Sequence, residues 1–93
     1  MICSFADKTT EALYQRHVPK GVSVEIATRA FRLLARIDSA MSLGDLQTPP
    51  SNRLHKLQGD KAERWSVSVN MQYRITFRFK NGDAHNVRFE DYH

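Results

Sequence analysis

The stretch WSVSVNMQYRITFRFK, residues 65–80, decides the fold that this chain can adopt. Apolar and polar residues alternate along its first part, up to Asn70, and again along its second part, from Tyr73 onward. A period of two residues is typical of a strand with one buried and one exposed face. The short connection through Met71 and Gln72 makes the two strands antiparallel neighbours. We therefore predict a pair of half-buried strands at the centre of the protein.

The two faces of this strand pair differ in chemistry. The inward face of the second strand carries apolar side chains, most of them aromatic. Its outward face has no carboxylate and carries the cations Arg74, Arg78 and Lys80. Such a face can hold a polyanion, and the same pattern also fits a solvated surface whose cations bind nothing specific.

Two helices are predicted before the strands. Asp7 is a candidate N-cap of the first helix, which we expect to end near His17 because Pro19 follows. Ser23 is a candidate cap of the second helix, in which apolar residues recur at steps of three and four over residues 24–40. We interpret the opposite side of this helix as a solvated face rather than a binding ridge; it carries Arg29, Arg32 and Arg36.

Short elements are predicted between the second helix and the strand pair. Residues 42–52 contain one glycine and two prolines, which predicts a connector with one helical turn near residues 43–46. Residues 53–57 alternate weakly and are a candidate short strand. A turn is expected at residues 58–60 because of the sequence Gln-Gly-Asp.

The two ends of the chain complete the predicted sheet. Asn81-Gly82 is a strong signal for a tight hairpin turn, since both residues tolerate positive φ. It leads into a last strand over residues 83–92, with Val87 and Phe89 facing inward. Residues 1–5 are short and mostly apolar, and they are a candidate edge strand.

These elements predict a single α+β domain over residues 1–93. Two N-terminal helices pack on one face of a small antiparallel sheet, because nothing else in the chain can cover that face. The opposite sheet face is expected to be open and basic. Further expected members of the core are Cys3, Tyr14 and Met41.

Composition limits the possible partners and compartments. The formal net charge of +4 favours nucleic acid, an acidic protein segment or a membrane surface, without choosing among them. The single cysteine excludes an intrachain disulfide and a cysteine-based zinc site. Because there is no apolar run of roughly 20 residues and no signal-peptide pattern, we expect a cytoplasmic protein. The four histidines are scattered, so we predict neither a metal site nor another cofactor.

The candidate catalytic groups are His55, Arg74 and the closing residues Asp91, Tyr92 and His93. These residue types fit the cleavage of RNA by its own 2′-hydroxyl, which needs a base, an acid and a cation near the phosphoryl oxygens. Histidine serves either proton role, and arginine can clamp a phosphate with two parallel hydrogen bonds. Each residue type is also common on surfaces, and from the residues alone a closing Asp-Tyr-His fits a frayed end better than a site.

Several separated motifs resemble those of the HigB-like toxins, the plasmid-maintenance killer proteins of the RelE superfamily. They are Met-Ile-x-Ser-Phe at residue 1, Arg-Leu-His at residue 53, Trp-Ser-Val-x-Val-Asn at residue 65, Tyr-Arg-Ile-Thr-Phe-Arg-Phe at residue 73, Asn-Gly-Asp-Ala at residue 81 and the final Asp-Tyr-His. The resemblance covers essentially the whole chain, including the order of its elements.

The resemblance implies a small α+β ribonuclease that enters the ribosomal A site and cuts messenger RNA there, thereby inhibiting translation. It implies three partners: the ribosome, mRNA and a helix-turn-helix (HigA-like) antitoxin, whose complex with the toxin binds operator DNA. By position it places His55, Arg74, Asp91, Tyr92 and His93 in the active site. We assign Arg74 to the scissile phosphate, His55 and His93 to proton transfer or phosphate contact, and Tyr92 to base or phosphate contact. Asp91 receives an orienting or base role.

Further RNA contacts are expected from polar residues near these positions, which are Arg53, Lys56, Asn70, Gln72 and Arg78. The family often has a lysine where this chain has Gln58, so we expect a slow toxin, and the cleavage rate of a Gln58→Lys variant tests this. The alternative to an enzyme is a non-catalytic RNA- or ribosome-binding module of the same fold. A third reading is a module that binds an acidic peptide.

The alternation along the last strand creates a conflict within the candidate site. Arg74 and Tyr92 belong to the polar faces of their strands, whereas Asp91 and His93 fall in phase with the inward Phe89. Either the strand bulges near Glu90 or the last residues leave the sheet, and we expect the second.

Overall fold

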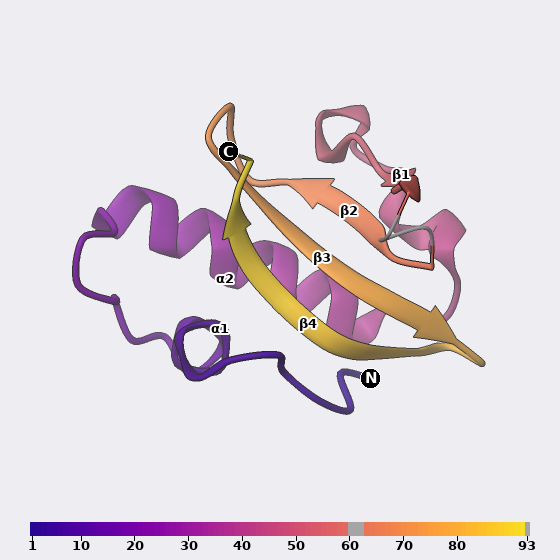
Figure 1. The fold of residues 1–93 in the computed structure, drawn as a ribbon, viewed down its shortest axis with the longest axis horizontal. Coiled ribbons are helices and arrows are strands. Elements are labelled where there is room, and N and C mark those ends of the chain that lie inside the picture. Colours follow the sequence, from indigo (N-terminus) through magenta and orange to yellow (C-terminus); the bar gives the residue numbers. More distant parts are fainter. Residues whose placement is uncertain (60–62, 93) are drawn as a thin grey trace.

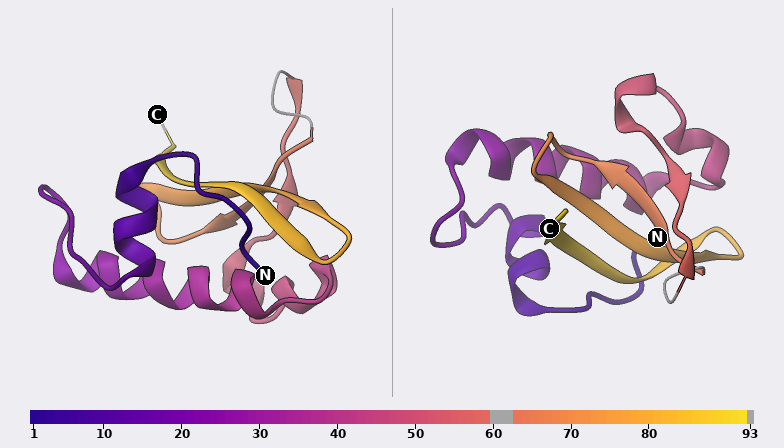
Figure 2. Two further views of the ribbon diagram at one scale, coloured as in Figure 1. Left: turned by 90° about the horizontal axis from the view of Figure 1, so that it is seen from below. Right: turned by 45° about the horizontal axis from the view of Figure 1, so that its top comes forward.

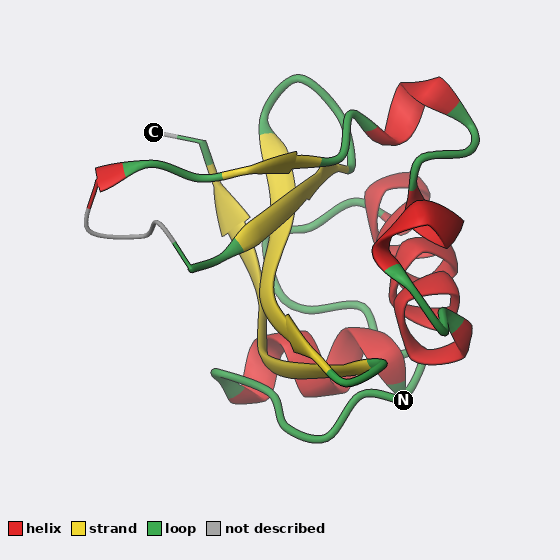
Figure 3. Ribbon diagram, turned by 90° about the vertical axis from the view of Figure 1, so that its right-hand side faces the viewer, coloured by secondary structure: helices red, strands yellow, loops and turns green. Residues whose placement is uncertain are grey.

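The computed structural model describes residues 1–59 and 63–92 and is shown in Figure 1. The elements in chain order are the helices α1 (Lys8–Tyr14) and α2 (Val24–Ser39), the short 3-10 helices η1 (Leu43–Leu46) and η2 (Pro50–Asn52), and the strands β1 (His55–Lys56), β2 (Trp65–Ser68), β3 (Tyr73–Lys80) and β4 (Asp83–Asp91). The four strands form one sheet in the order β1-β2-β3-β4, and all neighbours are antiparallel. Figures 2 and 3 show α2 running along one face of this sheet, with α1 packed beside α2 and β4. The predicted α+β fold is confirmed.

The predicted strand pair is β2 and β3, which carry much of the core. Their register places Val67 opposite Ile75, and both side chains are fully buried against the helices. Phe77 is also fully buried, whereas Trp65 at the sheet margin is only partly buried. The helices contribute the buried residues Leu13, Ala27, Ala30, Leu33, Leu34 and Ile37. The period-two pattern therefore identified the buried face correctly.

Both predicted helix caps are present. The Asp7 carboxylate accepts a hydrogen bond from the backbone N–H of Thr10 at 2.8 Å, and the Ser23 hydroxyl accepts one from Ile26 at 3.1 Å. The prediction that α1 continues to His17 is wrong. Arg16 has a φ of 67°, in the left-handed region, and the N–H groups of Arg16 and His17 close the last turn on carbonyls within the helix.

Two predicted core residues are on the surface. Met41 is 85% exposed, because α2 ends at Ser39 and the extended backbone of Ala40 carries the chain off the helix face. Cys3 is also exposed. Tyr14 is partly buried, and its ring lies between those of Phe5 and Phe31. Leu46 in η1 supplies core volume that the sequence analysis did not assign, being 1% exposed.

The N-terminal segment covers the outer edge of β4. Ile2 and Phe5 form isolated parallel bridges with Ala84 and Val87, so the expected edge strand takes this reduced form. The backbone N–H of Cys3 donates to the carbonyl of Ala84 at 2.8 Å. Covering this edge satisfies backbone groups that would otherwise face solvent as a template for another strand.

Asp38 on α2 holds the N-terminal segment and α1 together. Its carboxylate accepts hydrogen bonds from the backbone N–H of Ile2 at 2.7 Å and from the Tyr14 hydroxyl at 2.8 Å. The Ile2 bond is the main cause that lowers the pKa of Asp38, although partial burial opposes it. The hydrogen bond from the Tyr14 hydroxyl to Asp38 raises the pKa of Tyr14.

We expect Asp38→Asn to reduce the free energy of unfolding at pH 7 by about 1–2 kcal/mol, the contribution of hydrogen bonds to a charged group. A carboxyl group with a lowered folded-state pKa stabilises the protein above its ordinary pKa, and this stabilisation is lost as the pH falls through the folded-state pKa. Urea unfolding of both proteins at pH 7 and pH 3 measures the effect. Glu63→Gln, an exposed substitution outside the helices, is the control. An equal loss at both pH values would contradict the prediction.

A β-bulge in β4 sets which side chains face outward. Next to the turn, Lys80 pairs with Asp83, whereas beyond the bulge Thr76 pairs with Arg88, so β4 contains one extra residue. Asn86 accommodates it with a φ of 51°. Without this shift every residue from Arg88 onward would change its cross-strand partner and its face. The bulge therefore places Phe89 in the core and Glu90 on the outer face.

The prediction of an open and basic outer face is wrong at its centre. Ser66 and Thr76 point to this face, yet both are 0% exposed. Glu90 from β4 adds a carboxylate that pairs with Arg74, nitrogen to oxygen 3.3 Å. The alternation within β3 could not show this, because the carboxylate comes from a neighbouring strand whose register depends on the bulge.

Candidate active site

The strand registers bring three predicted site residues onto the outer face of the sheet. His55 is opposite Ser66, Ser66 is opposite Thr76, and Ser68 is opposite Arg74. Cross-strand partners point to the same face, so His55 and Arg74 share the side away from α2. The Arg74 guanidinium carbon lies 5.4 Å from the centre of the Tyr92 ring, which joins Tyr92 to this group.

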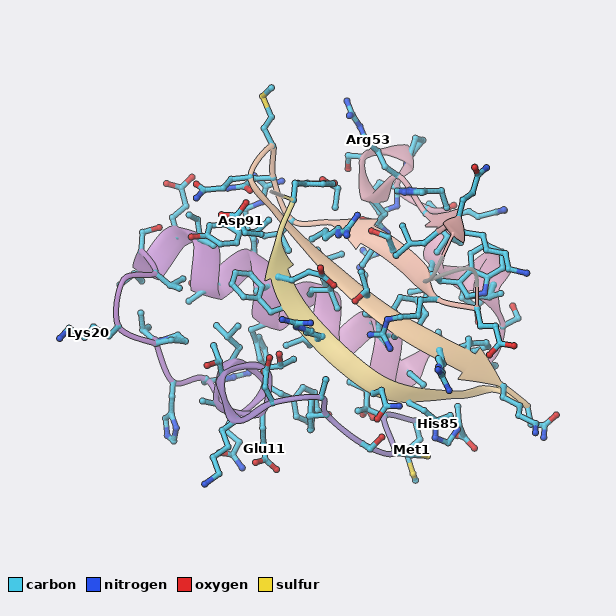
Figure 4. The ribbon with its side chains drawn as sticks, in the orientation of Figure 1. Met1, Glu11, Lys20, Arg53, His85 and Asp91 are labelled. Carbon is cyan, nitrogen blue, oxygen red and sulfur yellow. The ribbon has the colours of Figure 1, made fainter. Side chains whose placement is uncertain are left out.

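A groove with a volume of about 640 Å³ opens beside these residues. Its lining residues come from α2, from the segment leading into β1, from the end of β2 with the β2–β3 turn, and from Tyr92 after β4. Figure 4 shows Arg53 and Asp91 at this same end of the sheet, whereas His85 lies at the opposite end. The lining residues are Arg29, Ser51, Arg53, His55, Ser68, Val69, Asn70, Met71 and Tyr92. Its size and its mixture of cationic, polar and aromatic side chains suit a nucleotide with its phosphate.

Arg74 lies behind Tyr92 and is mostly buried. Its side chain is 16% exposed, and its Nη2 donates to Glu90 Oε2 at 3.3 Å. The Nε atom is buried, and no hydrogen-bond partner for it is found within residues 1–59 and 63–92. The stacking on Tyr92 is a cation–π contact, which restrains both side chains. A guanidinium in this partly desolvated position acts on a nearby phosphate more strongly than a solvated one would.

His55 is exposed at the edge of the groove, and its surroundings fix its tautomer. The ring Nδ1 lies 2.9 Å from the backbone carbonyl oxygen of Arg53. Because a carbonyl oxygen only accepts, Nδ1 must carry the proton. In the neutral ring Nε2 is then an acceptor, and in the charged ring it is a donor. His55 is thus prepared for either proton role at Nε2.

The end of the chain follows β4 further than expected. Asp91 pairs with Tyr73 within the sheet, and the N–H of Tyr92 donates to the Gln72 carbonyl at 2.9 Å. The prediction that the last residues leave the sheet is wrong as far as Asp91. Gln72 Nε2 donates to Asp91 Oδ2 at 3.2 Å, so these two predicted site residues contact each other. His93 lies outside the described residues, as does Asp60 of the predicted turn at residues 58–60.

The remaining predicted RNA contacts are divided between the groove and other surfaces. Arg53 lines the groove. Asn70 also lines it, but its Oδ1 accepts from the N–H groups of Gln72 and Tyr73 and thereby shapes the turn. Lys56 is opposite Trp65, on the other side of β1 from His55. Arg78 pairs with His85 on the turn side of the bulge, away from the groove. The structure therefore does not bring Lys56 and Arg78 into the groove.

Five lining residues were not among the predicted site residues, namely Arg29, Ser51, Ser68, Val69 and Met71. Arg29 was assigned to a solvated face, and it is indeed exposed, but η2 brings the groove to its side of α2. Ser51 lies in η2 itself, and Met71 at the β2–β3 turn is 97% exposed. A helical period shows which side of a helix is polar, but it cannot show which loop approaches that side.

Neither metal ligands nor membrane spans emerge from the described part of the chain. Within residues 1–59 and 63–92, no three His, Cys, Asp or Glu side chains come together in a way that could hold a metal ion. In the same ranges, no helix has the length and apolar character needed to cross a membrane.

Comparisons with known proteins point in one direction. The family model described as RelE-like toxin of type II toxin–antitoxin system HigB matches residues 3–93. A Proteus vulgaris protein named Endoribonuclease HigB is 40% identical over 93 residues, which is 100% of both chains. Toxin HigB-1 of Vibrio cholerae serotype O1 is 38% identical over 90 residues, or 94% of this chain and 93% of its own. A solved YoeB/ParE toxin from Agrobacterium tumefaciens shares the fold, with a TM-score of 0.53, 15% identity and 96% of each chain covered.

Proposed function

This chain belongs to the HigB family of RelE-like toxins of type II toxin–antitoxin systems, and we propose that it cuts messenger RNA on the ribosome, in the cytoplasm, and so inhibits translation. It is an endoribonuclease toxin by its full-length similarity to the Proteus vulgaris enzyme. Membership of a toxin–antitoxin family also gives it a cognate antitoxin. We propose a helix-turn-helix antitoxin, through which alone the toxin reaches operator DNA.

The proposed reaction is an attack of the RNA 2′-oxygen on the adjacent phosphorus. The P–O5′ bond breaks, which leaves a 2′,3′-cyclic phosphate on one product and a 5′-hydroxyl on the other. One group removes the 2′ proton, another protonates the leaving 5′ oxygen, and a cation balances the charge that develops on the phosphoryl oxygens. All of these roles can be filled by amino-acid side chains.

The observation that carries this proposal is that His55 and Tyr92 line one groove while the Arg74 guanidinium stacks on the Tyr92 ring. Arg74 is suited to the phosphoryl charge, and the Nε2 atom of His55 is suited to a proton transfer. Tyr92 offers a ring on which a base can stack beside the phosphate. We assign an orienting or base role to Asp91, which contacts Gln72, and a second proton-transfer role to His93.

The attack by the 2′-oxygen is tested with a modified messenger RNA. We expect a single 2′-deoxy nucleotide at the cleavage site to abolish cleavage there, because the nucleophile is absent. Cleavage of the two messages on purified ribosomes is compared by gel, and a 2′-deoxy substitution several nucleotides away is the control. Normal cutting at the deoxy nucleotide would show that water or another group is the nucleophile.

A further inference from the structure

A chain of polar contacts crosses the outer face of the sheet and ends at Arg74. Arg64, which precedes β2, donates from Nη2 to the Thr76 hydroxyl at 3.0 Å. The Thr76 hydroxyl lies 2.7 Å from Glu90 Oε1, and Glu90 Oε2 accepts from Arg74 Nη2 at 3.3 Å. Side-chain contacts thereby link the residue before β2 with strands β3 and β4.

The direction of each hydrogen bond in this chain follows from the groups involved. Arginine can only donate, so the Thr76 oxygen accepts from Arg64 and its own hydrogen must point to Glu90. One carboxylate oxygen of Glu90 is thereby held by Thr76, and the other is left to hold Arg74. The Thr76 hydroxyl thus aligns the carboxylate that holds the arginine.

Burial makes these contacts stiff. Thr76 is 0% exposed, and the side chains of Arg74 and Glu90 are 16% and 11% exposed. In such surroundings water competes poorly for the hydrogen bonds. Arg64 is fixed at a second point, because its Nη2 also donates to the Asn86 carbonyl at the β-bulge, at 2.6 Å. Burial lowers the pKa of Arg64, and the nearby charge of Glu90 opposes this shift.

We propose that Glu90 is a positioning residue for Arg74, and that Thr76, braced by Arg64, holds Glu90 in the orientation needed for that role. Glu90 fixes one end of a flexible side chain before the RNA arrives, so that the guanidinium meets the phosphate without first losing its rotational freedom. This inference rests on the proposed cleavage reaction, and it gives roles to Glu90, Thr76 and Arg64, which were not among the predicted site residues and do not line the groove.

The decisive variant is Thr76→Val, which keeps the shape of a buried side chain and removes the hydroxyl. Single-turnover cleavage of a reporter message is measured over a series of ribosome concentrations. We expect the maximal rate to fall about tenfold, which corresponds to about 1.4 kcal/mol of transition-state stabilisation, with the half-saturating ribosome concentration unchanged. Thr76→Ser, which retains the hydroxyl, should cleave at close to the wild-type rate.

A matched control separates positioning from stability. Thr10 is also 0% exposed, and its hydroxyl makes two hydrogen bonds, to Asp7 and from Phe89, on the helix side of the sheet. We expect Thr10→Val to lower the melting temperature and to leave the maximal cleavage rate of the folded protein unchanged. A rate loss in Thr10→Val equal to that in Thr76→Val would overturn the positioning role.

A double variant tests whether the effect passes through Arg74. In an Arg74→Ala background, Thr76→Val should cause no additional loss, because its target is already absent. A full tenfold loss in that background would overturn the proposal. If Thr76→Val does not fold, Glu90→Gln replaces it, since the neutral amide keeps the size and loses the charge that holds Arg74.

A readout independent of activity keeps this inference distinct from the proposed function. The ¹⁵N relaxation of the arginine Nε–H groups reports how tightly each guanidinium is held. The Arg74 signal should be rigid in the wild type and in Thr10→Val, and mobile in Thr76→Val. An Arg74 signal unaffected by Thr76→Val would overturn the inference even if the protein cleaves RNA. If the wild type does not cleave RNA although its Arg74 signal is rigid, the proposed function is overturned. The contacts that hold Arg74 would then have no role in catalysis.

Discussion

Replacing Arg74 with alanine is expected to reduce ribosome-dependent cleavage about 10²–10³-fold, the loss typical of removing one preorganised donor to developing charge. Arg74 is mostly buried behind the groove residue Tyr92, and its guanidinium is held by Tyr92 and Glu90. Single-turnover rates on reporter mRNA measure the effect. Arg32→Ala, an exposed substitution on α2, is the matched control and should cleave like the wild type.

Arg74→Lys separates charge from geometry. Lysine keeps the positive charge but lacks the planar group that stacks on Tyr92 and pairs with Glu90. We therefore expect the cleavage rate of Arg74→Lys to fall nearly as far as that of Arg74→Ala. Because either substitution leaves the largely buried Glu90 without this partner, melting curves must show that the variants are folded. A rate within threefold of wild type for folded Arg74→Ala would contradict the assigned role.

Replacing His55 with alanine is expected to reduce cleavage about 10²–10³-fold, within the range for loss of a general acid or base. Because Nδ1 of His55 is bonded to the Arg53 carbonyl, Nε2 is the nitrogen that can exchange a proton with the RNA. His55 is exposed, so an imidazole molecule can enter the space that the alanine variant leaves. Added imidazole should therefore restore part of the activity of His55→Ala. Imidazole should not restore the activity of Arg74→Ala, because the group missing from that variant is a fixed cation rather than a proton carrier.

His17→Ala serves as the matched control for His55. His17 is exposed near the end of α1, lining a different hollow between the two helices. This variant should cleave at the wild-type rate with and without imidazole. Full activity of a folded His55→Ala protein would remove His55 from the proton transfers and leave that role to other groups.

Local signals in the sequence were sufficient for most of the fold. The alternation on either side of Met71 predicted β2 and β3, and the Asp7 and Ser23 caps marked where both helices begin. These features depend on residues close in sequence, which the pattern contains. The exposure of Met41 was not predicted, because the helical spacing continues in the sequence beyond the point where the helix itself ends.

The parts of the site that could not be predicted depend on contacts between strands. The bulge at Asn86 decides that Glu90 faces Arg74, and no residue in β3 signals it. The same register keeps Asp91 inside the sheet, contrary to our expectation. His55 and Arg74 could be chosen from their chemistry and from the family resemblance, whereas Arg29 joins the groove only through the packing of η2 near α2.

Primer extension on a reporter messenger RNA, in a purified translation system with and without ribosomes, tests the central claim most directly. Wild type is compared with Arg74→Ala and with a chain lacking His93. We expect cuts in the wild-type reaction only when ribosomes are present, and we expect both variants to lose them. Cuts that appear equally without ribosomes would contradict the ribosome-dependent mechanism. No cuts by any of the proteins, with ribosome binding intact, would instead identify a non-catalytic binding module.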